Sequence, residues 1–268
     1  MTTVQDAPAS TAGTVPAEPG SRTGGGASLA RLTTVELRKL ADTRAGLWLL
    51  IVIGLAAAAT AVIMITAAPD AEQTYYGLLA FGLLPASVLL PVLGILSMTS
   101  EWSQRTALGT FTLTPARGRV VAAKLVAVAL IAVAATVAAA ALSAVANLIA
   151  IGTGGAGDWE ITVGQLARLL LNQVVFVLMG SAFGALLMNS PVAIVLYFAI
   201  PAVWSALGAM VTWLGRAAEW LDINRTAIPL SEASMTASQW GHLAVSCAFW
   251  VGLPLVLGTV RMLRREVS

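Results

Sequence analysis

Five long stretches of this chain contain no Asp, Glu, Lys or Arg, and they restrict what the chain can fold into. They cover residues 45–69, 73–100, 125–157, 169–215 and 233–260, which are 25, 28, 33, 47 and 28 residues long. A helix needs about 20 mainly apolar residues to cross roughly 30 Å of hydrocarbon. Four stretches therefore fit one spanning helix each, and the longest fits two. A soluble protein would have to bury such a helix six times over, so the pattern predicts an all-α membrane protein.

The longest stretch is divided at Met188-Asn189-Ser190-Pro191, because proline ends or kinks a helix and biases the residue before it away from the α conformation. Only 10% of the residues are charged, whereas a soluble domain carries about a quarter. We therefore predict a six-span transmembrane domain over residues 45–268. The expected spans are approximately 45–67, 77–99, 120–151, 166–188, 191–214 and 239–261.

The distribution of basic residues predicts the orientation of the spans. Of the 15 Lys and Arg residues, 12 lie before the first span, between the second and third spans, or after the last. Cytoplasmic loops carry such an excess. Both termini and the segment 101–119 are therefore expected in the cytoplasm, and the loop 215–238 outside the cell. The net charge of +2 reflects this bias, so no nucleic-acid partner is expected, and we place the chain in a bacterial cytoplasmic membrane as a multi-pass protein.

Two segments precede the first span. Residues 1–27 are rich in Ala, Thr, Pro and Gly and read as a disordered cytoplasmic tail. Residues 28–44 predict an amphipathic helix lying in the membrane surface, although the capping-box spacing of Thr33 and Glu36 would also allow a later start. Glu36 falls on the apolar side of this helix. That position is costly unless Glu36 pairs with a basic neighbour or projects toward a partner.

A polar segment between the second and third spans is the strongest indication of function. It runs from Glu101 through Arg105, Pro115 and Arg117 to Lys124, between two uncharged stretches. Acidic residues contribute little to orientation, so Glu101 is expected to serve a contact surface. For Arg119 and Lys124, beside the start of the third span, we favour a role as anchors whose long side chains reach back to the membrane surface.

Most catalytic chemistries find no support in this sequence. With one histidine, His242, and one cysteine, Cys247, a zinc or iron site of its own His and Cys residues is not expected. Neither of the two lysines follows a glycine, so there is no phosphate-binding G-x-x-x-x-G-K-[ST] loop for ATP. Two features suggest an intramembrane protease, but only weakly. Asp158 lies in a Gly-rich loop and has no second carboxylate to pair with. Ser181 could pair with His242, but it lacks the G-x-S-x-G spacing. The Gly180…Gly184 pair is better explained as a helix-packing face.

Polar side chains inside the predicted spans are few. Asn147, Asn172 and Gln173 are candidates for lining a substrate path, and tying helices together by hydrogen bonds is an equally good explanation for them. No Asp, Glu, Lys or Arg is expected in the interior of a span. A carrier driven by protons or sodium through a buried carboxylate is therefore disfavoured.

Two motifs and one loop together resemble a known family, the membrane subunits of type-2 ABC exporters. Residues 34–44 read TVELRKLADTR, close to the family's E-L-x-K-L…R pattern, and residues 101–124 are similar to its E…G-T…L…P-x-R…K pattern. An extended outer loop between the fifth and sixth spans is the third feature. The resemblance covers about residues 30–268, with one departure, since Arg105-Thr106 stands where the family usually has Gly-Thr.

The resemblance implies a permease subunit that is not itself an enzyme. Two copies, or one copy with a similar partner, would form the membrane unit, and two ABC ATPase subunits would bind beneath it and use ATP and magnesium. The residues implied in coupling to the ATPase are Glu101, Arg105, Thr106, Pro115, Arg117, Glu36, Arg38 and Lys39. The apolar spans suggest a hydrophobic or amphiphilic cargo such as a drug, an antibiotic or a lipid, exported by alternating access. The alternative is a non-transporting scaffold that anchors cytoplasmic partners through the same segment.

Overall fold

The computed structural model describes residues 28–103, 117–232 and 234–264, and every regular element in these ranges is a helix. Six helical stretches in this part of the chain are long and apolar enough to cross a membrane. They are Arg44–Ala67, Tyr75–Ser100, Gly118–Thr153, Val163–Leu187, Ser190–Met210 and Ala237–Met262. The prediction of an all-helical protein with six apolar helices of spanning length is thereby confirmed, and the chain is a multi-pass membrane protein.

The elements follow one another along the chain with short connections. They are α1 (Leu29–Asp42), α2 (Arg44–Ala67), η1 (Asp70–Glu72), α3 (Tyr75–Gly82), α4 (Leu84–Ser103), α6 (Arg117–Thr153), α7 (Val163–Leu187), α8 (Ser190–Met210), α9 (Thr212–Leu221), α10 (Ile223–Ala227), η2 (Ile228–Ser231), α11 (Ala237–Cys247), η3 (Ala248–Gly252) and α12 (Leu253–Arg264).

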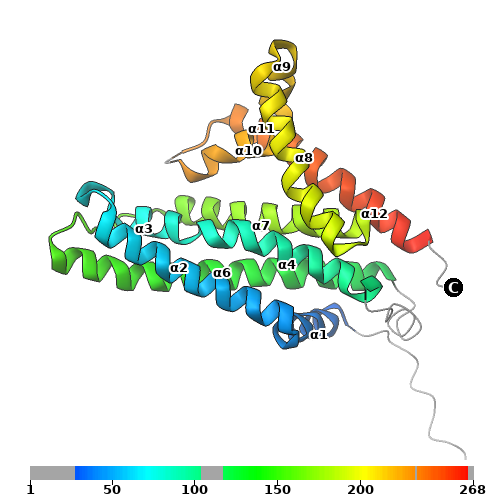
Figure 1. Cartoon of the computed structure of the whole chain (residues 1–268), viewed down its shortest axis with the longest axis horizontal. Coiled ribbons are helices and arrows are strands. Elements are labelled where there is room, and N and C mark those ends of the chain that lie inside the picture. Colours follow the sequence, from blue (N-terminus) through cyan, green and yellow to red (C-terminus); the bar gives the residue numbers. More distant parts are fainter. Residues whose placement is uncertain (1–27, 104–116, 233, 265–268) are drawn as a thin grey trace, which may run out of the picture.

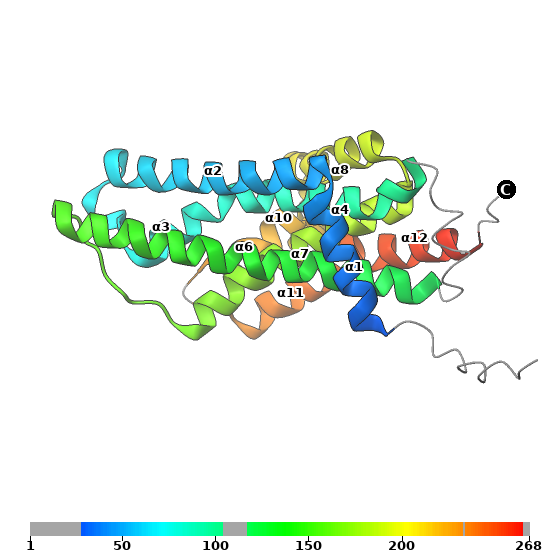
Figure 2. The same cartoon turned by 90° about the horizontal axis from the view of Figure 1, so that it is seen from below.

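The helices form two groups in space. Helices α2, α3, α4, α6 and α7 run roughly side by side (Figure 1), and α12 packs on α7. Helices α8 and α12 are inclined to this group and connect it with the short helices α9, α10 and α11 (Figure 1). Helix α1 lies at the end of the first group, where it crosses α6 (Figure 2). The tail 1–27 lies outside the described residues.

Helix α1 begins at the earlier of the two expected positions. Ser28 caps it by accepting a hydrogen bond from the N–H of Arg31, and Thr33 lies within the helix. Thr43 then breaks the helix with an extended backbone and caps α2 by accepting from the N–H of Gly46 at 3.2 Å. A Cβ at position 46 would lie 1.9 Å from the carbonyl oxygen of Leu40, so this sharp turn requires a glycine.

The second spanning stretch consists of two helices rather than one. Helix α3 ends at Gly82, and α4 starts at Leu84. Pro85 explains the break, because it has no N–H to donate to the carbonyl four residues earlier. Pro91 lies inside α4, next to a close backbone contact with α7.

Helices α4 and α7 approach each other through glycines. A Cβ on Gly180 would lie 2.3 Å from the carbonyl oxygen of Pro91, and one on Gly184 would lie 2.9 Å from that of Ile95. From the other side, a Cβ on Gly94 would lie 2.5 Å from the carbonyl oxygen of Val177. Small residues allow such close backbone contact between helices in membranes. The interpretation of Gly180 and Gly184 as a packing face is confirmed.

The fifth spanning helix is shorter than expected, and the sixth is interrupted. Helix α8 ends at Met210 and Val211 is extended, so the helix is shorter than the expected span 191–214. Short helices α9, α10 and η2 occupy most of the described part of the segment 215–238, and α11 begins at its end. In the sixth stretch, η3 is a π-helical turn that ends two residues before Pro254. Pro254 has no N–H to donate to the preceding turn, so that turn is free to widen.

Candidate functional site: a charged junction between α1, α4 and α6

A buried ion pair joins α1 to α6. The carboxylate of Glu36 accepts from the ammonium of Lys124, with 2.7 Å between Oε2 and Nζ. Lys124 is only 2% exposed and Glu36 only 5%. The same ammonium donates to the backbone carbonyl oxygen of Ser97 on α4 at 3.1 Å. Three helices therefore meet at one lysine.

A second lysine completes the group. Lys39, one turn further along α1, donates to the other carboxylate oxygen, with 2.8 Å between Nζ and Oε1. Burial by itself raises the pKa of Glu36, but the charge of Lys124 and hydrogen bonds from both lysines outweigh burial and hold that pKa below its ordinary value. Glu36 is therefore a carboxylate at neutral pH, and the group of three side chains carries one net positive charge. We call Glu36, Lys39, Lys124 and Ser97 the charged junction.

Two sequence-based interpretations are corrected here. Lys124 was expected to be an anchor at the membrane surface, and the spans were expected to hold no charged side chain. Instead Lys124 lies inside the spanning stretch Gly118–Thr153 and points into the protein. The physical reason is that Glu36, on the apolar side of α1, faces α6 and needs a cation there. Glu36 itself was the available signal, but the sequence could not say which lysine or arginine would meet it.

The apolar side of α1 packs against protein. Leu40 is 6% exposed and lies in a cluster with Ile53, Leu90, Leu93 and Val128, and Leu37 packs against the same cluster. Arg38 and Val35 lie on the opposite, exposed face. Of the expected coupling residues on α1, Glu36 is thus an internal contact, while Arg38 and the half-exposed Lys39 are accessible.

The remaining coupling residues lie at or beyond the edge of the described structure. The backbone of Glu101 belongs to the last turn of α4, and that of Arg117 begins α6. Arg105, Thr106 and Pro115 fall outside the described residues. Their part in a contact surface stays a prediction.

Two of the three candidates for a substrate path hold backbone segments together. Asn147 is fully buried and donates to the carbonyl oxygen of Asp158 at 2.7 Å. Gln173 is 2% exposed and donates to the carbonyl oxygen of Leu83, at the break between α3 and α4, at 3.3 Å. Both contacts match the interpretation of these residues as ties between chain segments.

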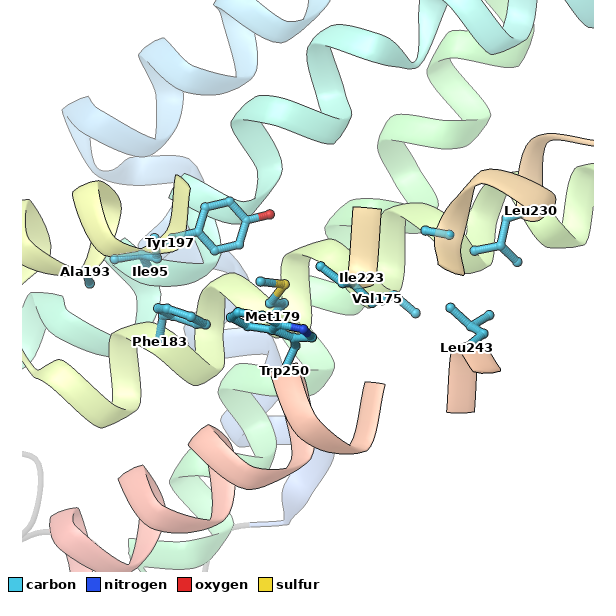
Figure 3. Close-up of a cluster of buried hydrophobic side chains, with 11 residues drawn as sticks. Ile95, Val175, Met179, Phe183, Ala193, Tyr197, Ile223, Leu230, Leu243 and Trp250 are labelled. Atoms are coloured by element: carbon cyan, nitrogen blue, oxygen red, sulfur yellow. The ribbon is translucent and has the colours of Figure 1, made fainter. Parts of the chain in front are cut away.

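The third candidate, Asn172, lines a cavity of about 350 Å³ between α4, α7, α8 and α10. Its other lining residues are largely apolar and aromatic. They are Ser87, Val88, Phe176, Met179, Tyr197, Phe198, Pro201, Ala202, Ile223 and Asn224. Tyr197 stands among the buried aromatic and aliphatic side chains of α7 and α8, with Met179 and Phe183 close by (Figure 3). An apolar cavity with a few polar groups is the usual form of a small-molecule site.

The protease-like residues have structural roles. Ser181 is fully buried and donates to the carbonyl oxygen of Val177 on its own helix at 2.9 Å. His242 packs against Trp220 with 4.1 Å between ring centroids, beside Glu219 and Arg225. Asp158 accepts from the N–H of Tyr75 at 3.3 Å. The structure does not bring Ser181 and His242 together in the residues it describes.

No group of three or more His, Cys, Asp or Glu side chains in the described ranges could hold a metal ion. The charged junction is one candidate site, because it buries charged groups where three helices meet. The Asn172 cavity is the other, because it combines apolar walls with amide and hydroxyl groups. Comparison of the sequence with family models and with curated proteins finds no match.

Proposed function

We propose that this chain is the permease subunit of an ATP-driven ABC exporter. In this proposal two copies, or one copy and a similar partner, form the membrane unit in a bacterial cytoplasmic membrane. Both termini and the segment 101–119 face the cytoplasm, and α1 lies at the inner membrane surface. Separate ATPase subunits bind ATP and magnesium, which the sequence of this chain has no phosphate-binding loop to hold.

The observation that best supports the proposal is the position of the charged junction. Lys124 joins α1 to α4 and α6. Helix α4 ends at Ser103 and α6 begins at Arg117, so the segment 104–116 connects the same two helices. A force applied to α1 or to this segment would therefore act on the second and third spans together. An energy-coupling surface needs such a connection.

Helix α6 is suited to carry the movement. It contains 37 residues, which corresponds to about 55 Å at 1.5 Å per residue. Lys124 holds it near one end, and Asn147 ties it to the loop before α7 near the other. A tilt imposed at the junction would reach the opposite end of the protein through one continuous helix.

The cargo in this proposal is hydrophobic or amphiphilic. The Asn172 cavity has no charged residue in its lining, and it offers amide and hydroxyl groups beside aromatic rings. Pro201 in α8 has no N–H to donate to the backbone carbonyl of Tyr197. This carbonyl therefore lacks its regular helical partner, and Tyr197 lines the cavity. A neutral molecule with an apolar body and a few hydrogen-bonding groups fits this chemistry.

The proposal is tested by purifying the tagged chain from its native membrane under mild conditions. An ATP-hydrolysing subunit should co-purify in stoichiometric amount. In the reconstituted complex, Glu101→Arg should leave the protein inserted and ATP hydrolysis active while transport falls. If no nucleotide-binding chain is ever present, the exporter proposal fails and the scaffold alternative stands.

A further inference from the structure

A small pocket lies beside the charged junction. It has a volume of about 120 Å³ and opens between α1, α2, α4 and the start of α8. Its polar lining consists of Glu36, Lys39, Thr43, Ser97, Ser100 and Ser190. Lys39, Thr43 and Ser100 already donate to Glu36, Leu40 and Ser97, and the hydroxyl of Ser190 is bonded to that of Thr99. The hydroxyl of Ser97 is different.

Two long helices begin at this pocket. Helix α2 has 24 residues, and Ala45 and Gly46 of its first turn are part of the lining. Helix α8 has 21 residues and starts at Ser190, which also lines the pocket. The first N–H groups of a helix have no partner within the helix, and its N-terminus carries about half a positive charge. Side chains already cap one N–H at each end, since Thr43 accepts from Gly46 and Asn189 accepts from Val192, and Pro191 has no N–H. The positive ends of the two helix dipoles still face one pocket, which favours an anion there.

A buried hydroxyl without a partner gives an independent indication of a ligand. Ser97 is 3% exposed, and its Oγ makes no hydrogen bond in the described part of the chain. Its backbone carbonyl is already occupied by Lys124. A buried hydroxyl left without a partner is destabilising, and an acceptor oxygen placed in the pocket would satisfy it.

The carboxylate in the lining does not oppose an anion. One oxygen of Glu36 lies 2.8 Å from the ammonium of Lys39 and the other 2.7 Å from that of Lys124. Its charge is therefore more than compensated, and the three side chains together remain positive. The side chain of Lys39 is 45% exposed, so an anion can approach this side chain from outside.

The pocket also lies where phosphate groups of a membrane are found. The first spanning stretch begins at Arg44, the second ends at Ser100 and the fifth begins at Ser190. Ends of spanning helices lie at the polar headgroup region. We propose that this pocket binds the phosphate group of a membrane phospholipid, with Lys39 and Ser97 as its donors beside the positive ends of α2 and α8. This inference does not depend on a role in transport.

The test uses the purified full-length chain, stripped of lipid in a neutral detergent. Native mass spectrometry measures binding of phosphatidylglycerol, and of diacylglycerol with the same acyl chains as the phosphate-free comparison. Inorganic phosphate is titrated separately and as a competitor of phosphatidylglycerol. We expect phosphatidylglycerol to bind with a stoichiometry of one at the pocket and diacylglycerol to bind much more weakly.

Variants assign the binding to this pocket. Lys39→Gln and Ser97→Ala should each weaken phosphatidylglycerol binding about tenfold, since a charge-assisted or buried hydrogen bond is lost. The matched controls are Arg31→Gln, an exposed cation on the same helix, and Thr66→Ala, an exposed hydroxyl at the other end of α2, away from the pocket. Both controls should bind as the native chain does. Thermal melting without lipid shows whether Lys39→Gln or Ser97→Ala has lost its fold, and the variant that melts normally decides the question.

Each outcome is decisive. Binding of inorganic phosphate that competes with the lipid and is lost in Lys39→Gln supports the phosphate site and identifies the free anion as a second source of the ligand. Equal binding of phosphatidylglycerol and diacylglycerol overturns the proposal, because apolar contact would then suffice. Unchanged binding in both pocket variants, or no binding of either phosphate probe, overturns it too.

Discussion

Glu36 and Lys124 are 88 residues apart in sequence, yet their charged atoms lie 2.7 Å apart in the interior of the protein. A buried pair of this kind contributes little net stability compared with apolar residues, but removal of one partner is costly. Here the pair also fixes which side of α1 faces α6. The contact therefore specifies the position of α1 on the spans.

The first prediction concerns the stability of this pair. Lys124→Met should lower stability by about 3–5 kcal/mol, because it leaves the Glu36 carboxylate buried with only Lys39 as a partner. The double variant Glu36→Gln/Lys124→Met should recover most of the loss. Thermal unfolding in detergent measures both, with the exposed Arg38→Met as the control. Additive effects of the two single changes would contradict an interaction between Glu36 and Lys124.

The second prediction is a pH dependence. The pKa of Glu36 is lowered in the folded protein from its ordinary value of 4.5. The unfolded state therefore binds the proton at higher pH than the folded state. The stabilisation is present above about pH 4.5 and is lost as pH falls through the lowered pKa. Melting temperatures of native protein and Glu36→Gln, measured from pH 7 to pH 3, should converge at the acid end. A constant difference across this range would show that Glu36 does not titrate as described.

The third prediction concerns the packing of α4 on α7. Gly180→Ala should destabilise the protein by about 1–3 kcal/mol, because the added methyl group would meet the backbone of Pro91. Gly54→Ala is the matched control, since a Cβ at that position meets nothing within 4 Å. The control should be neutral or slightly stabilising. Equal melting temperatures of the two variants would argue against close contact at Gly180.

The fourth prediction compares the amide of Asn172, which lines the cavity, with that of Asn147, which has a structural role. Asn172→Leu should reduce transport of a cargo by at least several-fold without a change in melting temperature, because its amide faces the cavity. Asn147→Leu should instead lower the melting temperature, since it removes the hydrogen bond to the Asp158 carbonyl. Uptake into inverted vesicles and thermal melting measure the two effects. Normal transport by a stable Asn172→Leu variant would remove Asn172 from the path.

Much of the fold could be predicted because it depends on local properties of the sequence. The lengths of the charge-free stretches indicated six spanning helices, and Gly180 and Gly184 indicated a packing face. Other features depend on contacts between distant segments. The sequence showed that Glu36 needs a partner, but Lys124 could be identified only when α1 and α6 were placed together. The break at Leu83 has a local cause in Pro85, but the contact of Gln173 with that break required the packing of α7 on α3 and α4.

We expect a separate ATPase subunit to act on this chain through α1 and the segment 101–119. Val35 is the best probe, because it is 46% exposed and lies on the face of α1 opposite Glu36. A photo-crosslinking residue at position 35 is compared in native membranes with one at Leu55, which is 66% exposed on the spanning helix α2. We expect position 35 to yield an adduct with a nucleotide-binding chain and position 55 to yield none. Absence of such an adduct from position 35, in membranes where the variant is correctly inserted, would contradict the claim.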